Sequence, residues 1–452
     1  MDNLKQIFRK SRNSRVGRGQ ANHAIRLRPT VPPKPKKWKG REGLTYPAYW
    51  LKMSGVAGIA VVALTWASTL EVPEERLQLS WTLTADDLAR VVTPGLDEGR
   101  LPGQINIGDQ NHSFEAEITY TFDHKLQQEA ERLFDRYQPD YGAFAAIDPD
   151  SGEVLALVSH QKSGPPLGNL ALQARFPAAS VFKIVTAAAA IDLGKASPGT
   201  VIPFNGKSTT LYKSQVLRHK NNKWTRRPTL TKAFSQSSNP YFARLGVERV
   251  GGERLNYYAA QLGFNRGLKS DFLFELGTTE FEAEDKWSTA EVASGFTKNT
   301  LISPLHGALL AATAINNGHL PHPHLVTAVE RADGVLVYSD SGEPGEQVIK
   351  PKTASSLRVL MSETVKSGTA RKEFSRFFIN HRKSVKVGGK TGRLSGHSPQ
   401  GTNNWFVGYA MLKDRRIAFA ILTVDVEKWQ VRPATLANQI LRSYFSSQSV
   451  AG

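Results

Sequence analysis

Ser180-Val-Phe-Lys-Ile-Val-Thr-Ala-Ala-Ala-Ala190 places a hydroxyl and an amine three residues apart at the head of an apolar, alanine-rich run. Residues at this spacing are neighbours on a helix. Because the run is apolar all round, we expect the helix to be buried, with Ser180 held beside Lys183. An aliphatic serine is a weak nucleophile until a neighbouring group takes its proton, so the pair is a candidate nucleophile and base.

Two further motifs follow along the chain, Ser237-Ser-Asn239 and Lys390-Thr-Gly392. With the first motif they supply a nucleophile, a base, a proton relay and an oxyanion site, the groups used by active-site-serine acyl transferases. Lys390 follows the strand-like stretch Ser384-Val-Lys-Val-Gly-Gly389. Glycines in a strand indicate that another group approaches the backbone closely.

Each motif also occurs at a second place, where its context differs. Ser159 and Lys162 have the spacing of the first motif, but they follow a strand-like stretch and precede a proline-containing loop, so no helix returns the lysine to the serine. Ser11-Arg-Asn13 lies in a basic tail. Lys366-Ser-Gly-Thr369 imitates the third motif at the end of a predicted helix, where Gly368 is typical of a helix C-terminus.

From about Phe114 to the C-terminus the chain resembles the transpeptidase domain of bacterial penicillin-binding proteins, within the serine β-lactamase and penicillin-binding superfamily. Beyond the three motifs, the resemblance rests on Thr119-Tyr-Thr-Phe-Asp123, Ala146-Ile-Asp-Pro-Asp-Ser-Gly-Glu-Val-Leu-Ala156, Asn169-Leu-Ala171, Ser303-Pro-Leu305, Asn316-Asn-Gly318 and Trp405-Phe-Val-Gly-Tyr409. Helices flanked by antiparallel strands indicate an α+β domain. The resemblance implies a five-stranded antiparallel sheet flanked by helices and joined to an all-helical lobe, with Ser180 between them.

The resemblance also implies catalytic roles. Ser180 attacks the carbonyl of the penultimate D-alanine of a peptidoglycan stem peptide, and Lys183 takes its proton. A lysine with a pKa of about 10.4 is neutral only about once in 2,500 at pH 7, so burial and a nearby cation must lower its pKa. Lys390 is the expected cation. Ser237 relays the proton to the leaving amine, and Asn239 holds a substrate amide.

Arg393 departs from the family pattern. Relatives usually carry threonine or serine here, whose hydroxyl helps Thr391 bind the terminal carboxylate of the substrate. The resemblance makes Thr391, Gly392 and Arg393 substrate-binding residues and places the oxyanion between the backbone N–H groups of Ser180 and Arg393. The guanidinium either replaces the missing hydroxyl through a charge-assisted hydrogen bond or points to solvent.

Positive charge is concentrated at the N-terminus. Residues 1–52 hold fourteen Lys and Arg against Asp2 and Glu42, which is +12 of the formal net charge of +18. Residues 53–70 carry no charge and as a helix span about 27 Å, close to the roughly 30 Å core of a bilayer. The positive-inside rule then places residues 1–52 in the cytoplasm and Glu71 onward outside. A cleaved signal peptide fits poorly because the charged region is too long, and a buried helix is the remaining alternative.

The expected organisation is a disordered basic cytoplasmic tail (1–45), a transmembrane anchor (46–70), a short extracytoplasmic connector (71–113) and a transpeptidase-like domain (114–452). Before the domain we expect a helix near 85–92. Within the domain we expect a long helical stretch from 180 to about 288, a helix over 354–365, strands over 385–391, 404–412 and 416–424, and a final helix over 432–445. The connector is too short for a glycosyltransferase domain, so we expect another protein to polymerise the glycan.

Composition excludes several kinds of site. The chain has no cysteine, which excludes disulfides and thiolate metal sites. His306, His319, His322 and His324 lack metal-ligand spacing, so we expect surface or capping roles for them and neither a metal nor a cofactor. A basic tail is typical of nucleic-acid binding, but this one contains no recognisable module, and we expect no nucleic-acid partner.

The main functional expectation is a membrane-anchored peptidoglycan D,D-transpeptidase that acts on stem peptides, binds β-lactams and works beside a separate glycosyltransferase. A D,D-carboxypeptidase or endopeptidase differs only in whether water or an amine resolves the acyl-enzyme. A β-lactamase needs a deacylation base, and Glu275, Glu280 and Glu282 are interpreted as surface charges. From a different class, a penicillin-binding sensor or a non-turnover scaffold of a wall-synthesis complex remains an alternative.

Overall fold

A central five-stranded antiparallel sheet organises the molecule, with strand order β12-β13-β14-β4-β5. The computed structural model describes residues 24–26, 82–108, 113–340, 342, 345–377 and 384–446. The strands of the sheet are β4 (Tyr141–Ile147), β5 (Val154–Gln161), β12 (Lys386–His397), β13 (Gln400–Leu412) and β14 (Arg415–Asp425). The predicted α+β fold with a five-stranded sheet is confirmed.

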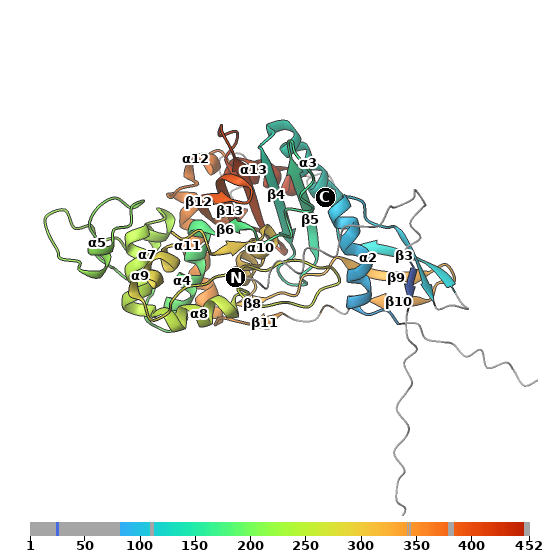
Figure 1. Ribbon diagram of the computed structural model, residues 1–452, viewed down its shortest axis with the longest axis horizontal. Helices are drawn as coiled ribbons and strands as arrows, with labels where there is room; N and C mark the ends of the chain where they lie inside the picture. Colours follow the sequence, from blue (N-terminus) through green and yellow to red (C-terminus); the bar gives the residue numbers. More distant parts are fainter. Residues whose placement is uncertain are drawn as a thin grey trace, which may run out of the picture.

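Helices cover both faces of this sheet (Figure 1). On one face, α10 (Pro304–Ile315) packs against β14 and β4 and is buried along its whole length. Its apolar surface on all sides fits a helix that also contacts α11 (Pro351–Lys366). On the other face, α3 (His124–Tyr137) and α13 (Pro433–Ser446) share a second hydrophobic cluster with the strands. The apolar residues of α3 recur at helical spacing and point into this cluster.

The helical lobe lies at one end of the molecule (Figure 1). Its elements are α4 (Lys183–Asp192), α5 (Lys213–Leu217), α6 (Leu230–Ser235), α7 (Asn239–Leu245), the π-helical turn η3 (Gly246–Val250), α8 (Gly252–Gln261) and α9 (Lys286–Ser294). The expected continuous helical stretch over 180–288 is therefore wrong. Three long non-helical segments, 193–212, 218–229 and 262–285, interrupt it, and the first and third begin near glycines that follow a helix.

A second sheet lies at the opposite end, beside α2 (Ala85–Glu98), with strand order β1-β2-β3-β9-β10 (Figure 1). Its strands are β1 (Ala24–Arg26), β2 (Gln104–Gly108), β3 (Ser113–Tyr120), β9 (Val326–Arg331) and β10 (Leu336–Ser339). Leu88 of α2 and Ile105 of β2 belong to the main hydrophobic core. The described part of the expected connector thus packs against the domain that follows it.

Of the predicted basic tail, the structure describes only residues 24–26. Residues 24–26 pair in parallel with β2, which differs from the disorder expected for the tail. The rest of the tail and the expected membrane segment over 53–70 lie outside the described residues. Among the helices that the structure describes, none has the length and apolar character needed to cross a bilayer.

The C-terminal predictions agree well with the structure. The helix expected over 354–365 is α11, the three strands are β12, β13 and β14, and the last helix is α13. Strand β12 continues past Thr391 to His397. Short elements complete the fold: β6 (Phe176–Pro177) pairs with β7 (Leu301–Ile302), β8 (His319–Leu320) pairs with β11 (Glu346–Gln347), and α12 (Arg371–Phe374) follows α11.

Candidate active site

Ser180 lies in a tight turn between the sheet and the helical lobe. The turn is the 3₁₀ element η2 (Ala179–Phe182), and α4 begins only at Lys183. Ala179 has φ +49°, a left-handed conformation that costs a non-glycine residue about 1–2 kcal/mol. A Cβ atom on Gly295, at the end of α9, would overlap the carbonyl oxygen of Ala179. The glycine therefore allows the end of α9 to pack closely against the turn that carries Ser180. Strained backbone of this kind is common at functional sites.

Lys183 is the buried partner of Ser180. Its Nζ lies 2.7 Å from Ser180 Oγ and 2.8 Å from Asn239 Oδ1, and it also contacts the backbone carbonyl of Ser294. The side chain is fully buried. Burial lowers the pKa of Lys183 well below its ordinary value, and the positive charge of Lys390 lowers it further. The structure thus brings the predicted nucleophile and base together, whereas sequence reasoning missed Ser294.

Ser237 and Lys390 form a second cluster. Lys390 Nζ donates to Ser237 Oγ at 2.9 Å and to the carbonyl of Thr391 at 2.7 Å. Burial lowers the pKa of Lys390 to about 7. Ser237 has φ +57°, again a strained conformation for a non-glycine residue. The charge of Lys390 acts on Lys183, so the two clusters are coupled electrostatically.

A second threonine joins the third motif. Thr369 Oγ1 lies 2.6 Å from Thr391 Oγ1, although the segment 366–369 was interpreted as an imitation of the motif. Gly368 lies at the C-terminus of α11 as predicted, where its N–H donates to the carbonyl of Glu363 at 3.0 Å without a left-handed φ. Its missing side chain also permits close packing, because a Cβ there would overlap the carbonyl oxygen of Ser235. The contact spans 22 residues of sequence, and no local pattern signals it.

Strand β12 forms the edge of the sheet beside the nucleophile. A Cβ on Gly392 would lie 3.3 Å from Val181 Cγ2 and 3.4 Å from the carbonyl oxygen of Ala178, so the glycine permits this close approach. Trp405 of the neighbouring strand donates from Nε1 to the carbonyl of Pro177 at 2.9 Å. These contacts fix the nucleophile turn against the third motif.

Arg393 is exposed, and no hydrogen bond or ion pair engages its guanidinium in the part of the chain that the structure describes. With Thr391 and Thr369 it lines a pocket of about 330 Å³.

The second copy of the first motif has a structural role. Ser159 Oγ accepts from the N–H of Leu170 at 3.0 Å and donates to the carbonyl of Gly168 at 3.3 Å.

His306 corrects one expectation, because it is fully buried rather than at the surface. Its Nδ1 accepts from the N–H of Gly277 at 2.7 Å, and its Nε2 lies 2.7 Å from the carbonyl of Leu262. These partners fix a neutral tautomer, and burial lowers the pKa of His306 to about 4. Within the described ranges, no group of His, Asp and Glu side chains is arranged to hold a metal ion.

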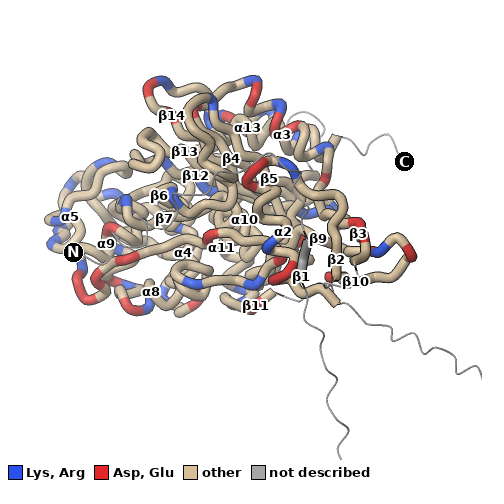
Figure 2. The backbone as a smooth tube through the Cα atoms, turned by 45° about the vertical axis from the view of Figure 1, so that its right-hand side comes forward, with Lys and Arg blue, Asp and Glu red and all other residues tan. Residues whose placement is uncertain are grey.

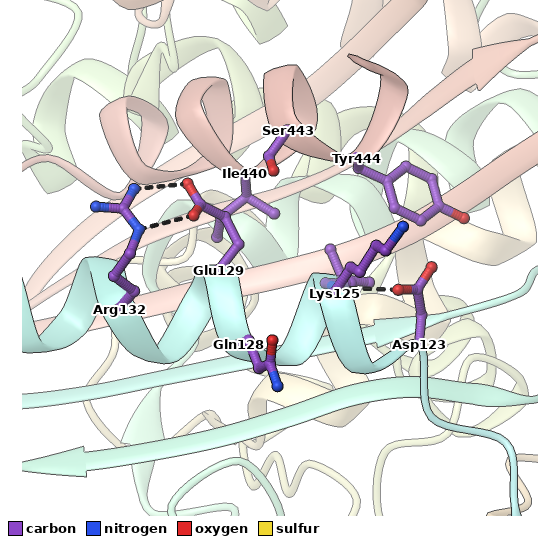
Figure 3. Close-up of a pocket in the computed structure, with 9 residues that line it drawn as sticks. Asp123, Lys125, Gln128, Glu129, Arg132, Ile440, Ser443 and Tyr444 are labelled. Atoms are coloured by element: carbon purple, nitrogen blue, oxygen red, sulfur yellow. Dashed lines mark hydrogen bonds and ion pairs between the residues drawn. The ribbon is translucent and has the colours of Figure 1, made fainter. Parts of the chain in front are cut away.

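A separate surface pocket of about 290 Å³ lies between α3 and α13 (Figure 3). Glu129 and Arg132, on neighbouring turns of α3, form two hydrogen bonds of 2.8 Å across its edge. None of the motif residues lines this pocket. The ion pair is local to one helix, so we assign the pocket no catalytic role.

Comparisons with known proteins agree with this geometry. The sequence model of the penicillin binding protein transpeptidase domain matches residues 142–444. The peptidoglycan D,D-transpeptidase PbpA of Mycobacterium tuberculosis is 25% identical over 320 residues, which cover 63% of this chain and 62% of that protein. Its imipenem acyl-enzyme structure has a TM-score of 0.60 at 21% identity and covers 78% of this chain and 83% of that one. The D,D-transpeptidase domain of a peptidoglycan glycosyltransferase from Eggerthella lenta has a TM-score of 0.61 at 24% identity, with coverage of 76% and 84%.

Proposed function

The chain belongs to the penicillin-binding protein transpeptidase family, and we propose that it is a serine D,D-transpeptidase that cross-links peptidoglycan stem peptides through an acyl-enzyme on Ser180. The observation that carries this proposal is the fully buried Lys183, with its Nζ 2.7 Å from Ser180 Oγ and its pKa lowered by burial and by Lys390. Because the chain spans 62% of the length of its mycobacterial relative, activity and partners are inferred from the site.

In the proposed acylation step, Lys183 acts as a neutral amine. Its two protons suit the two carbonyl acceptors that contact it, Asn239 Oδ1 and the backbone of Ser294. The lone pair is then left for the hydroxyl proton of Ser180. The Ser180 Oγ bonds to the carbonyl carbon of the penultimate D-alanine, and the oxyanion receives hydrogen bonds from the backbone N–H groups of Ser180 and Arg393. One such donor contributes about 3 to 4 kcal/mol in related sites.

Collapse of the tetrahedral intermediate breaks the C–N bond to the terminal D-alanine. Its amine takes the proton that Lys183 removed from Ser180, relayed by Ser237, while Lys390, 2.9 Å from Ser237 Oγ, holds the relay hydroxyl in place. The amine of a second stem peptide then attacks the ester and regenerates Ser180. Attack by water instead would make the protein a carboxypeptidase, and failure of this step would leave a penicillin-binding sensor or scaffold.

We propose that the substrate carboxylate binds beside β12. Thr391 and Thr369 present two hydroxyls 2.6 Å apart, and Arg393 lines the same pocket. Thr369 then supplies the hydroxyl that relatives carry at the position of Arg393. The same groups would hold the carboxylate of a β-lactam.

We further propose that residues 53–70 anchor the chain in the cytoplasmic membrane, with the catalytic domain outside and a separate glycosyltransferase as partner. The support is the +12 charge of residues 1–52 ahead of an uncharged stretch. Protease added to intact spheroplasts should then digest the chain beyond Glu71 and spare the tail. The pairing of residues 24–26 with β2 argues against this topology, because it places those residues on the same side as the domain. Digestion of both the tail and the domain would contradict the proposed anchor and agree with the pairing.

The proposed activity is tested with a synthetic stem pentapeptide ending in D-Ala-D-Ala, with and without an acceptor peptide carrying a free amine. A transpeptidase releases D-alanine and forms the cross-linked dimer, measured by mass spectrometry. Release of D-alanine with only the hydrolysed tetrapeptide would support a carboxypeptidase. Penicillin labelling without any turnover would support a sensor or scaffold.

A further inference from the structure

Positive charge of the described domain is gathered in one segment of the helical lobe, residues 205–228, which we call the basic arm. The arm has no Asp or Glu. It carries seven exposed cationic side chains: Lys207, Lys213, Arg218, Lys220, Lys223, Arg226 and Arg227. Of the formal net charge of +18, residues 1–52 hold +12 and the arm holds +7, so all other residues together sum to −1. The prediction from sequence placed the basic character in the tail alone and missed this second concentration.

The arm's cations form no close ion pair with a described residue, although the charge of Lys213 acts on Asp285 and Glu291. Among the ion pairs of the described residues, none involves an arm residue. Two large aromatic side chains are also exposed there, Trp224 at 72% and Tyr212 at 55%. Figure 2 shows the blue Lys and Arg segments around α5. Exposed cations beside exposed aromatic faces are suited to a polymeric anion that also offers apolar contacts.

The arm is held in place and is joined to the catalytic site. Its two ends are paired by hydrogen bonds between the backbones of Phe204 and Arg226, at 3.0 and 2.9 Å. Asn239 donates from its backbone N–H to the carbonyl of Ser208 at 2.7 Å and from Nδ2 to the carbonyl of Thr209 at 3.0 Å. The Oδ1 of the same Asn239 contacts Lys183 at 2.8 Å. The first part of the arm, at Ser208 and Thr209, is therefore joined to the catalytic site through Asn239.

The position of the arm favours a substrate-side ligand over a membrane surface. In Figure 1, α5 and the second sheet lie at opposite ends of the longest axis. The described domain begins at the sheet end, where the N–H of Leu83 donates to the carbonyl of Val337 at 2.9 Å. A segment that connects the domain to a membrane would therefore leave from the end farther from the arm.

We propose that the basic arm binds the peptide-bearing glycan polymer itself, through the free carboxylates of stem peptides not engaged at Ser180. This inference rests on the proposed function. Many weak contacts along one polymer raise the local concentration of stem peptides near the site. Because the arm is exposed, its attraction is screened as ionic strength rises and the Debye length shortens to about 8 Å at physiological salt.

The test is co-sedimentation of the full chain, kept in detergent, with purified peptidoglycan sacculi stripped of phosphodiester polymers. The arm variant changes four residues: Lys207→Gln, Lys220→Gln, Lys223→Gln and Arg227→Gln. The matched control removes the same charge elsewhere, at exposed lysines that form no ion pair with a described residue: Lys125→Gln, Lys269→Gln, Lys352→Gln and Lys413→Gln. At low salt the arm variant should bind about ten-fold more weakly or worse, and the control within about two-fold of the unchanged chain.

An equal loss of binding to sacculi in both variants would overturn the proposal, and so would unchanged binding of the arm variant. Arm-dependent binding that persists on glycan freed of stem peptides by an amidase would also overturn it. Arm-dependent binding to anionic vesicles but not to sacculi would overturn it too, and would assign the arm to lipid. A double variant, Lys220→Gln with Lys223→Gln, should give an intermediate loss and guards against misfolding of the larger variant. Penicillin labelling of the unchanged chain is measured in parallel, since its absence would refute the proposed function independently of the arm.

Discussion

At the scale of single residues, the site depends on two buried lysines that play different parts. Lys183 has its pKa lowered by burial and by a neighbouring positive charge, whereas burial alone lowers the pKa of Lys390. This difference fits the proposed role of Lys183 as the base of the pair. Lys390 keeps its proton up to about pH 7, and its positive charge lowers the pKa of Lys183.

Replacing Lys390 with methionine should move the acidic limb of the pH profile for penicillin acylation to higher pH. Without the neighbouring cation the pKa of Lys183 rises, so a smaller fraction of the base is neutral at any given acidic pH. The measurement is the second-order acylation rate between pH 5 and 9. An acidic limb that stays in place while the rate falls uniformly would mean that Lys390 does not tune Lys183.

Gly295 should be intolerant of a side chain. Gly295→Ala adds a Cβ that overlaps the carbonyl of Ala179, in addition to the cost of a left-handed φ of +62°. We expect a loss of about 2 to 4 kcal/mol in the free energy of unfolding and a fall in acylation rate. The matched control is Gly99→Ala, at φ +70° with no atom within 4 Å of the added Cβ, which should cost about 1 kcal/mol and leave acylation unchanged. Equal effects of the two would show that the contact with the nucleophile turn is unimportant.

Thr369 and Arg393 should affect substrate binding more than the chemical step. Thr369→Val removes one of the paired hydroxyls at nearly constant shape, and we expect KM for the stem peptide to rise about ten-fold with kcat little changed. Thr369→Ser should restore most of the affinity. Arg393→Thr should remain competent in acylation and change KM. A fall in kcat of several orders of magnitude in either folded variant would instead indicate a catalytic role.

At the scale of elements, local sequence patterns predicted the contacts between residues that are close along the chain. They missed the contacts between segments that are far apart in the sequence. The spacing of Ser180 and Lys183 predicted their contact, and the glycine-containing strand predicted β12. The carbonyl of Ser294 and the hydroxyl of Thr369 enter the site through packing of α9 and of the loop after α11, which no periodicity in the sequence encodes. The sequence predicts a surface or capping role for His306 and misses its burial, which depends on the segment 262–277 that folds over α10.

His306 should make the domain sensitive to acid. Its pKa is lowered from 6.5 to about 4 in the folded state, so below pH 6.5 the unfolded chain takes up the proton first. The free energy of unfolding should therefore fall by about 3 kcal/mol between pH 6.5 and pH 4 from this group, and show no dependence on it above pH 6.5. Urea unfolding of His306→Gln across this range checks it. An acid dependence identical to that of the unchanged chain would contradict the assignment.

At the scale of the whole molecule, the sheet and the helical lobe bring three motifs from distant parts of the sequence to one place. The central sheet supplies Lys390 and Thr391, and the lobe supplies Lys183 and Asn239. The positive charge is divided between the two ends of the molecule. The basic arm belongs to the helical lobe, whereas the basic tail and the anchor expected from the sequence precede the end that carries the second sheet. The family resemblance predicted the sheet and the lobe, while the contact between the basic arm and Asn239 became visible only in three dimensions.

The central claim is that Ser180 forms the acyl-enzyme. It is tested most directly by incubating the full chain with benzylpenicillin and measuring the intact mass, followed by peptide mapping, for the unchanged protein and for Ser180→Ala. We expect one penicilloyl adduct on the peptide containing Ser180 and no adduct in the variant. An adduct that persists in Ser180→Ala, for example at Ser159, would contradict the claim.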